Sequence, residues 1–176
     1  MITRERWGIL LGEMIEMREA AGRVAPRVRP MPLPGVGASA QEIADAESRL
    51  GFALDAQHAA LLREGNGWPD VFGMGDLLST ADLGSGPLWS TANETLDIFY
   101  EDGPFETFPP RGEVYPIHAS NQDVFVIWRG GPVVEHGHPV YWLGGEVVDQ
   151  WPNVFEFCLA TVRLNEVSIE HALRRR

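Results

Sequence analysis

Apolar residues recur at helical spacing near the two ends of the chain and gather in short, strand-like runs through its middle. Near the N-terminal end, one apolar stripe predicts an amphipathic helix from about Arg4 to Ala21. The residues of that stripe are Trp7, Leu10, Leu11, Met14 and Met17. Prolines at 26, 30, 32 and 34 then predict an extended linker over residues 23–38, because proline disrupts helices and central strands.

Residues 39–67 have the pattern of two capped helices joined by a tight turn. Ser39 and Glu42 stand three positions apart, which is the spacing of a capping box at the start of a helix. Gly51 is typical of the left-handed residue that ends a helix, and Asp55 is a suitable cap for the second helix. We therefore expect a helical hairpin in this segment.

After residue 67 the pattern changes to short apolar runs separated by glycine, proline and aspartate, which is typical of strands and turns. Capping-box spacing at Thr91 and Glu94 predicts a short helix, and Asn153 with Glu156 predicts the start of a last one. The predicted strands are Val114–His118, Val124–Trp128, Val133–Glu135, Val140–Leu143 and Glu146–Val148, with weaker candidates at Val71–Met74 and Leu77–Leu78.

Helices at both ends with strands between them predict an α+β fold of one domain, because one face of the sheet needs a cover. We expect the N-terminal helices and a C-terminal helix to pack on a mainly antiparallel sheet of about five to six strands. The predicted segments are an N-terminal helix (1–22), a Pro-rich linker (23–38), the helical hairpin (39–67), a strand-rich acidic region (68–150) and a C-terminal helix with a basic tail (151–176).

The negative charge of the chain lies almost entirely in its middle. Residues 64–156 hold fifteen acidic side chains against Arg111 and Arg129 alone, a net charge of −13, whereas the whole chain has a net charge of −11. A surface of this sign repels nucleic-acid phosphates and anionic lipids, and it attracts basic proteins. We therefore expect a protein partner, and neither direct nucleic-acid binding nor membrane binding. An acidic surface that only keeps the protein in solution is the alternative interpretation.

Cysteine usage and hydropathy indicate the compartment. The N-terminal residues lack the apolar core of a signal peptide, and no apolar run is long enough to cross a bilayer. A single cysteine, Cys158, excludes an internal disulfide and a multi-cysteine zinc site, which agrees with a reducing compartment. All 14 basic residues are arginine, which we interpret as the codon usage of a GC-rich bacterial source. The expected location is the cytoplasm.

Few residues have the spacing of a catalytic or metal-binding site. His136 and His138 would share one face of a strand and are the best candidate metal ligands, with His118 or Asp149 as a third. The glycine between them indicates a turn, so we interpret both histidines as residues that shape a hairpin. There is no G-x-S-x-G motif, and Cys158 lies in an apolar stretch typical of a buried cysteine. We expect a non-enzymatic protein without cofactor or metal; a metal-dependent hydrolase at the two histidines is the weaker alternative.

Acidic and aromatic residues alternate between residues 97 and 108, and a second such cluster lies near residue 70. Protein interfaces use this combination, because aromatic side chains supply contact area and charges attract the partner. The predicted partner-binding residues are Trp68, Asp70, Asp97, Tyr100, Glu101, Asp102, Phe105, Glu106 and Asp123. The alternative is a core aromatic next to a solvated acid, or for Asp123 a turn residue that bonds to the backbone.

A set of residues in the helical hairpin carries a family resemblance: Glu42-Ile43, Glu47, Leu50-Gly51-Phe52, Leu54, Leu61-Leu62 and Asn66-Gly67. Their order resembles the N-terminal signature of the SUKH superfamily, which includes fungal cell-wall-synthesis regulators and many bacterial immunity proteins. Weaker similarity continues through Val114–Ile117, Asp123–Ile127 and Val140–Trp142, so it covers roughly Ser39 to Leu164. Asp55 and His58 stand where the family often has proline and an aromatic residue.

The resemblance implies a bacterial immunity protein that neutralises a cognate toxin. Many toxins of such systems are nucleases, whose clefts are basic because they hold phosphates. An acidic surface on this chain would cover such a cleft. The alternative within the same family is an intracellular regulatory scaffold of the cell-wall-regulator type. Because the helical hairpin is close to neutral in charge, we expect the acidic region after it to contact the partner.

Overall fold

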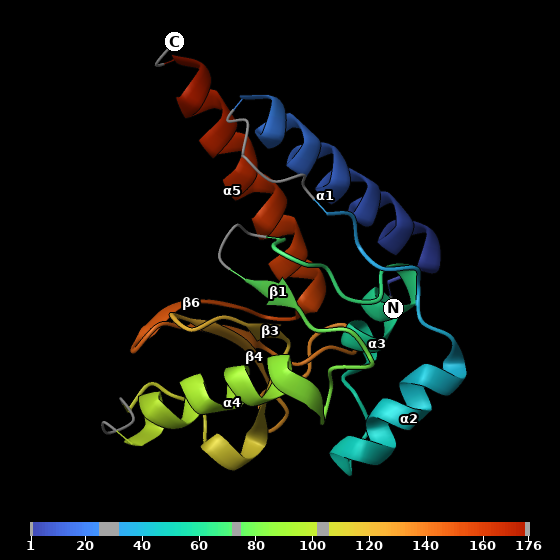
Figure 1. Ribbon diagram of the computed structural model, residues 1–176, viewed down its shortest axis with the longest axis vertical. Coiled ribbons are helices and arrows are strands. Elements are labelled where there is room, and N and C mark those ends of the chain that lie inside the picture. Colours follow the sequence, from blue (N-terminus) through green and yellow to red (C-terminus); the bar gives the residue numbers. More distant parts are fainter. Residues whose placement is uncertain (1, 25–31, 72–74, 102–105, 175–176) are drawn as a thin grey trace.

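The computed structural model describes residues 2–24, 32–71, 75–101 and 106–174, and it has the α+β architecture that the sequence predicts (Figure 1). Within these residues there are five α-helices, one short 3-10 helix and six strands. The strands form two antiparallel sheets, where the sequence predicted a single one. None of the described helices is long and apolar enough to cross a membrane.

The larger sheet has the order β2-β4-β5-β6. Its strands are β2 (Val114–Pro116), β4 (Val124–Trp128), β5 (Val140–Leu143) and β6 (Val147–Trp151), and all neighbours are antiparallel. β4 and β5 have the predicted bounds, residue for residue. The predicted strand Val114–His118 is divided, because the backbone of Ile117 bonds to Phe125 on one side and to Leu78 on the other. The second sheet therefore pairs β3 (His118–Ala119) with β1 (Asp76–Leu77).

The predicted strand Val133–Glu135 is wrong, because these residues enter a two-residue turn instead. Val134 and Gly137 exchange backbone hydrogen bonds of 2.8 and 3.0 Å around it. The two central residues, Glu135 and His136, have φ values of 51° and 68°, in the left-handed region that side chains with a Cβ disfavour. Proline at 132, directly before the segment, has no backbone N–H to donate, which also disfavours strand pairing there.

The helical hairpin is confirmed in detail. α2 (Ala40–Leu50) begins with the predicted capping box, in which Ser39 accepts from the Glu42 N–H and the Glu42 carboxylate accepts from the Ser39 N–H. Gly51 ends the helix in the left-handed conformation, with φ of 75°. Asp55 caps α3 (Ala56–Glu64) through its side-chain oxygen.

Helices α1 (Arg4–Val24) and α5 (Val154–Arg174) lie side by side and run in the same direction (Figure 1). The Trp7 ring meets the Phe155 ring edge-on at 5.0 Å, and further along the pair Met14 lies beside Val162. The predicted cap of α5 is confirmed, because the Asn153 side chain accepts from the Glu156 N–H at 3.0 Å. Residues 25–31 of the predicted linker, and the last two residues of the basic tail, lie outside the described residues.

α4 (Gly86–Glu101) lies on the opposite side of the larger sheet from α1 and α5 (Figure 1). It buries Ala92 and Leu96 against the strands, and the Thr95 hydroxyl donates to the Ser120 carbonyl at 2.9 Å. The capping box predicted at Thr91 and Glu94 is wrong, because the helix starts five residues earlier and Thr91 lies inside it. Glu94 is therefore an exposed residue on the outside of α4.

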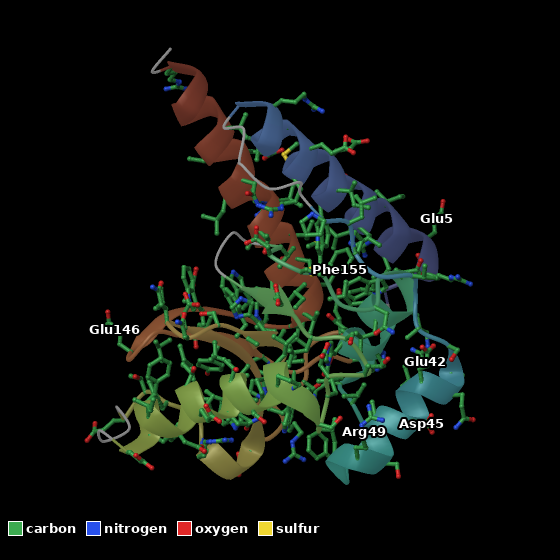
Figure 2. The ribbon with its side chains drawn as sticks, in the orientation of Figure 1. Glu5, Glu42, Asp45, Arg49, Glu146 and Phe155 are labelled. Carbon is green, nitrogen blue, oxygen red and sulfur yellow. The ribbon has the colours of Figure 1, made fainter. Side chains whose placement is uncertain are left out.

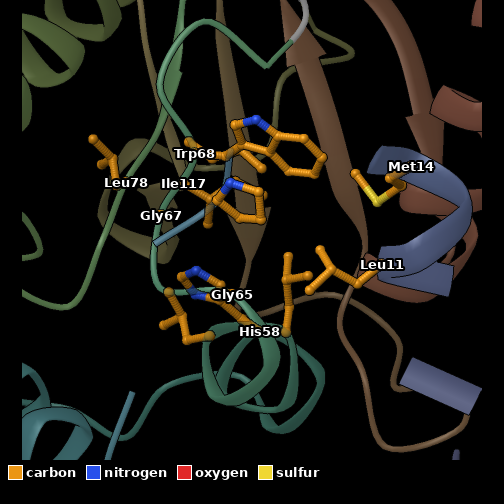
Figure 3. A pocket seen from close by; sticks show the side chains of 12 residues that line it. Leu11, Met14, His58, Gly65, Gly67, Trp68, Leu78 and Ile117 are labelled. Carbon is orange, nitrogen blue, oxygen red and sulfur yellow. The ribbon is translucent and has the colours of Figure 1, made fainter. Parts of the chain in front are cut away.

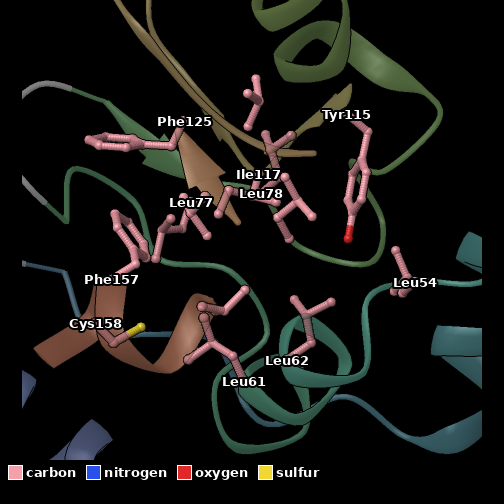
Figure 4. Close-up of a cluster of buried hydrophobic side chains, with 14 of the residues drawn as sticks. Leu54, Leu61, Leu62, Leu77, Leu78, Tyr115, Ile117, Phe125, Phe157 and Cys158 are labelled. Atoms are coloured by element: carbon pink, nitrogen blue, oxygen red, sulfur yellow. The ribbon is translucent and has the colours of Figure 1, made fainter. Parts of the chain in front are cut away.

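One hydrophobic core joins the sheets to the helices (Figure 4). Phe125 of β4 and Phe157 of α5 pack with ring centroids 5.1 Å apart, and Leu62 of α3 is buried against the same cluster. Cys158 is fully buried there, as predicted, and burial raises the pKa of its thiol to about 12. The core therefore holds β4, α3 and α5 together and leaves α4's outer face to the solvent.

Candidate partner-binding surface

The outer face of α4 carries a row of carboxylates. Glu94, Asp97 and Glu101 are all exposed and stand at spacings of three and four residues, so they lie on one side of the helix. The opposite side carries the buried Ala92 and Leu96. Two of the predicted partner-binding residues, Asp97 and Glu101, thus reach the solvent from a rigid element.

One cation touches this row. The guanidinium of Arg111, from the 3-10 helix Arg111–Glu113, bonds to the Asp97 carboxylate at 2.8 and 2.9 Å and to the Asn93 side chain at 2.8 Å. Among the described residues no basic side chain forms an ion pair with Glu94 or Glu101. The row therefore keeps a net negative charge after its internal pairing.

The position of these carboxylates is unfavourable for the isolated helix. The C-terminal end of a helix carries a partial negative charge, and α4 has no basic residue in its last turn. Glu101 lies at that end, and Asp97 lies one turn before it, so each carboxylate also faces a like charge. A carboxylate at the C-terminal end destabilises a helix by about 0.3–1 kcal/mol, and each like-charge pair destabilises it by about 0.2–0.5 kcal/mol. A bound cationic group would remove this cost.

The segment after α4 adds two further carboxylates. Glu106 is exposed, and it lies two residues before Phe108, which packs edge-on against Tyr100 at 5.3 Å. Glu113 is exposed on the 3-10 helix and accepts a 2.8 Å hydrogen bond from the Trp128 indole. We call Glu94, Asp97, Glu101, Glu106 and Glu113 the acidic surface.

Half-buried aromatic side chains adjoin the acidic surface. Trp128, which bonds to Glu113, also meets Tyr141 edge-on at 6.0 Å. Both rings are partly exposed on the β4 and β5 strands. Aromatic residues of this kind supply contact area at low entropic cost, so acids and aromatics do occur together here, although the aromatic residues are not the predicted ones.

Tyr100 has an internal role. Its hydroxyl donates to the Pro109 carbonyl, and burial raises the pKa of Tyr100 to about 12, although the nearby Arg111 charge opposes that rise. The side chain thereby fastens the chain that follows α4 to the helix. Two other predicted residues, Asp102 and Phe105, lie outside the described residues.

The prediction is wrong for Trp68 and Asp123, because both side chains are buried. Trp68 is only 2% exposed, and its indole N–H donates to the Pro32 carbonyl at 2.8 Å. The Asp123 carboxylate accepts from the Trp142 indole at 2.9 Å and from the Ser120 hydroxyl at 3.0 Å. Neither side chain is available to a partner in the folded protein.

Asp70 contacts Arg18 of α1 through both its backbone and its side chain. Its carbonyl accepts a hydrogen bond from the Arg18 guanidinium, and its carboxylate lies 3.7 Å from the same group. Arg18 is 5% exposed, so Asp70 neutralises a buried cation. Asp70 also has a left-handed backbone, with φ of 49°, which this contact helps to hold. Its charge is therefore balanced internally, and we do not count it in the acidic surface.

Two residues of the acidic surface, Glu94 and Glu113, and the two aromatic residues beside it were missed from the sequence. Glu94 was assigned to a cap, although the spacing 94, 97 and 101 is the signature of one helical face. Glu113, Trp128 and Tyr141 come together only through the pairing of β2, β4 and β5. No local pattern in the sequence reports that pairing.

The two histidines that are the weak metal candidates have structural contacts in and beside the turn between β4 and β5. One oxygen of the buried Asp55 accepts from the Gln57 and His58 N–H groups at 2.9 and 3.0 Å. The other accepts the backbone N–H of His138 at 2.8 Å and lies 2.9 Å from its Nδ1. His136 occupies the strained turn described above. Over the described parts of the chain, no three histidine, cysteine, aspartate or glutamate side chains gather where a metal ion could bind.

The cavity next to Trp68 is too small for a ligand (Figure 3). Its volume is about 10 Å³, and its lining is almost entirely apolar, with side chains from Leu11, Met14 and Ile117 among others. That space is close to the minimum for one water molecule. Burial lowers the pKa of His58, which lines it, to about 4. A larger depression of about 410 Å³ lies beside Arg4, whose charge is neutralised by Glu64 at 2.9 Å.

Comparison of the chain with models of known protein families gave no match, and comparison with curated proteins gave none.

Proposed function

We propose that this protein is a non-enzymatic binding protein that neutralises a basic partner, most specifically the immunity protein of a bacterial toxin. The acidic surface covers a basic surface of that toxin and blocks it. A nuclease is the favoured class of toxin, since its cleft must attract phosphates. Such a protein acts in the cytoplasm, where the toxin's substrate is found.

A single observation carries the proposal: three exposed carboxylates lie on one face of α4, and one of them, Glu101, lies at the unfavourable end of the helix dipole without a cation beside it among the described residues. Charges that destabilise the free protein and are compensated by a bound cation are typical of a binding surface. The neighbouring aromatic residues Trp128 and Tyr141 provide contact area. The resemblance of residues 39–67 to the SUKH superfamily supports the same function.

The test is co-expression with the product of the adjacent gene. The wild-type chain is expected to restore growth and to form a complex whose affinity falls as salt is raised, because attraction between charged surfaces is screened. Absence of both growth rescue and a complex would overturn the proposal for that pair. Recovery of several unrelated partners from native cells, with no toxin among them, would favour the regulatory scaffold instead.

A matched pair of variants tests the surface itself. The variant E94Q/E101Q/E106Q removes three exposed charges from the acidic surface and leaves the Asp97 to Arg111 pair intact. It is expected to weaken the complex at least tenfold, which is about 1.4 kcal/mol. The control E5Q/E19Q/D45N removes three exposed charges from α1 and α2, where Figure 2 labels Glu5 and Asp45. Equal losses in the two variants would show that net charge, and not this surface, drives binding.

A further inference from the structure

The parallel helices α1 and α5 leave a groove on the side turned away from the sheets. It has a volume of about 370 Å³ and is lined by Glu13, Glu16 and Met17 of α1 and by Leu159, Val162, Arg163 and Glu166 of α5. On α5, Leu159 and Glu166 stand two and nine residues after Phe157, which at helical periodicity places them opposite the side that packs on the sheet. The groove thus opens away from the sheets, and its apolar lining, which includes Val162, is the outer edge of the hydrophobic core.

The groove has an apolar floor and charged walls. Met17 and Leu159 are half-buried along the floor, and Val162 is buried beneath them. Glu13, Glu16 and Glu166 are exposed carboxylates on the walls, with Arg163 as the one cation among the lining residues. In the described part of the chain none of these four charged groups forms an ion pair. The charges are therefore available to a partner.

The dimensions suit one further helix. The α5 lining runs from Leu159 to Glu166, which is two turns or roughly 11 Å of helix. A furrow between two packed helices is where side chains of a third helix fit, in the helix-in-groove mode of recognition. Ile9, one turn before Glu13, and Val167, next to Glu166, are 57% and 66% exposed and lengthen the apolar strip at its ends.

We propose that this groove binds an amphipathic helix of a partner protein, one that carries basic residues on both sides of an apolar stripe. Charge complementarity selects that occupant, since the lining carries three carboxylates and one guanidinium. A second copy of the chain would bring like-charged walls together. Helices α1 and α5, which line the groove, lie across the sheets from α4 (Figure 1), so a contact at the groove is separate from one at the acidic surface.

The experiment uses the full chain and two synthetic peptides. Both peptides are 14-residue helices with leucines at i, i+3, i+7 and i+10; one has arginines beside the stripe, and the other has glutamates. Titration followed by amide chemical shifts and calorimetry is expected to give at least tenfold tighter binding of the basic peptide. The shifts should concentrate on residues 9–17 and 159–167. Shifts that centre on α4, or equal affinity for both peptides, would overturn the proposal.

Charge-reversed variants separate the groove from general attraction to an acidic protein. E13R/E16R/E166R should lose the basic peptide and prefer the acidic one. The matched reversal E94R/E101R/E106R on the acidic surface should change groove binding less than twofold, and equal loss in both variants would refute a specific groove. L159Q keeps every charge but makes the floor of the groove more polar, so it should weaken binding of the basic peptide about fivefold. Dimers in sedimentation that E13R/E16R/E166R abolishes would assign the groove to a second copy and overturn the proposed occupant.

Discussion

The strained turn between β4 and β5 makes a quantitative prediction about stability. Glu135 and His136 have φ values of 51° and 68°, and a left-handed backbone costs about 1–2 kcal/mol for a residue with an ordinary side chain. Asn-Gly is the pair that two-residue hairpin turns of this kind favour. We therefore expect the double variant E135N/H136G to be more stable than the wild type.

The size of the gain follows from two opposing terms. Relief of strain at both positions contributes about 2 kcal/mol, and the extra freedom of glycine in the unfolded chain removes about 0.5–1 kcal/mol. The contacts that hold the turn are retained, because the Gln57 side chain donates to the carbonyl of residue 135 at 3.0 Å, and that carbonyl belongs to the backbone. The expected net gain is about 1 kcal/mol, or roughly 2–4 °C in Tm for a chain of this length.

Urea denaturation measures the gain as a shift of the midpoint at constant slope. The control P132G/V133N places the same residue types in the same loop at positions without positive φ, and it should be less stable than the wild type. An E135N/H136G protein that is no more stable than the wild type, with the fold intact by circular dichroism, would refute the argument from strain.

Three further predictions concern buried groups. R18M removes a 5% exposed cation that bonds to Asp70, and it should cost about 2 kcal/mol in urea denaturation, against less than about 0.5 kcal/mol for the exposed control R163M. Burial lowers the pKa of His58 and His118 to about 4, so the unfolded chain takes up protons that the folded protein excludes, and stability should fall as pH falls from 6.5 to 4. H118Q should reduce the dependence of the free energy of unfolding on pH in this range by up to about 1.4 kcal/mol per pH unit. An unchanged pH dependence would contradict the lowered pKa of His118. The buried Cys158 thiol, whose pKa burial raises to about 12, should react with Ellman's reagent only after unfolding.

Signals carried by residues close together in sequence predicted their structure well. The capping box at Ser39 and Glu42, the left-handed stop at Gly51 and the cap at Asn153 each need only three or four neighbouring residues. β4 and β5 were predicted with their observed bounds because Gly, Pro and Asp mark the turns beside them. The same kind of signal failed at Thr91 and Glu94, since a helix that starts earlier makes that spacing a coincidence.

The acidic surface could be predicted only in part, because exposure depends on contacts between distant segments. Trp68 and Asp123 carry the chemistry of an interface, but the Pro32 carbonyl and the Trp142 indole satisfy their polar groups inside the protein. A hydrogen bond offsets the free-energy cost of burying a polar atom, and its partner can lie anywhere in the chain. Helical periodicity, by contrast, reports one face directly, and the observed helix α4 brings Asp97 and Glu101 to the same side.

The parallel contact between α1 and α5 has a consequence for the order of folding during synthesis. The apolar stripe of α1 that includes Trp7 and Met14 leaves the ribosome early, but its cover, Phe155 and Val162, is made only after all six strands. Contacts between residues so far apart in sequence form slowly, because a long loop must close first. Until then the part of the α1 stripe that faces α5 stays uncovered, and an apolar surface of this kind is what chaperones hold and what aggregates when they do not.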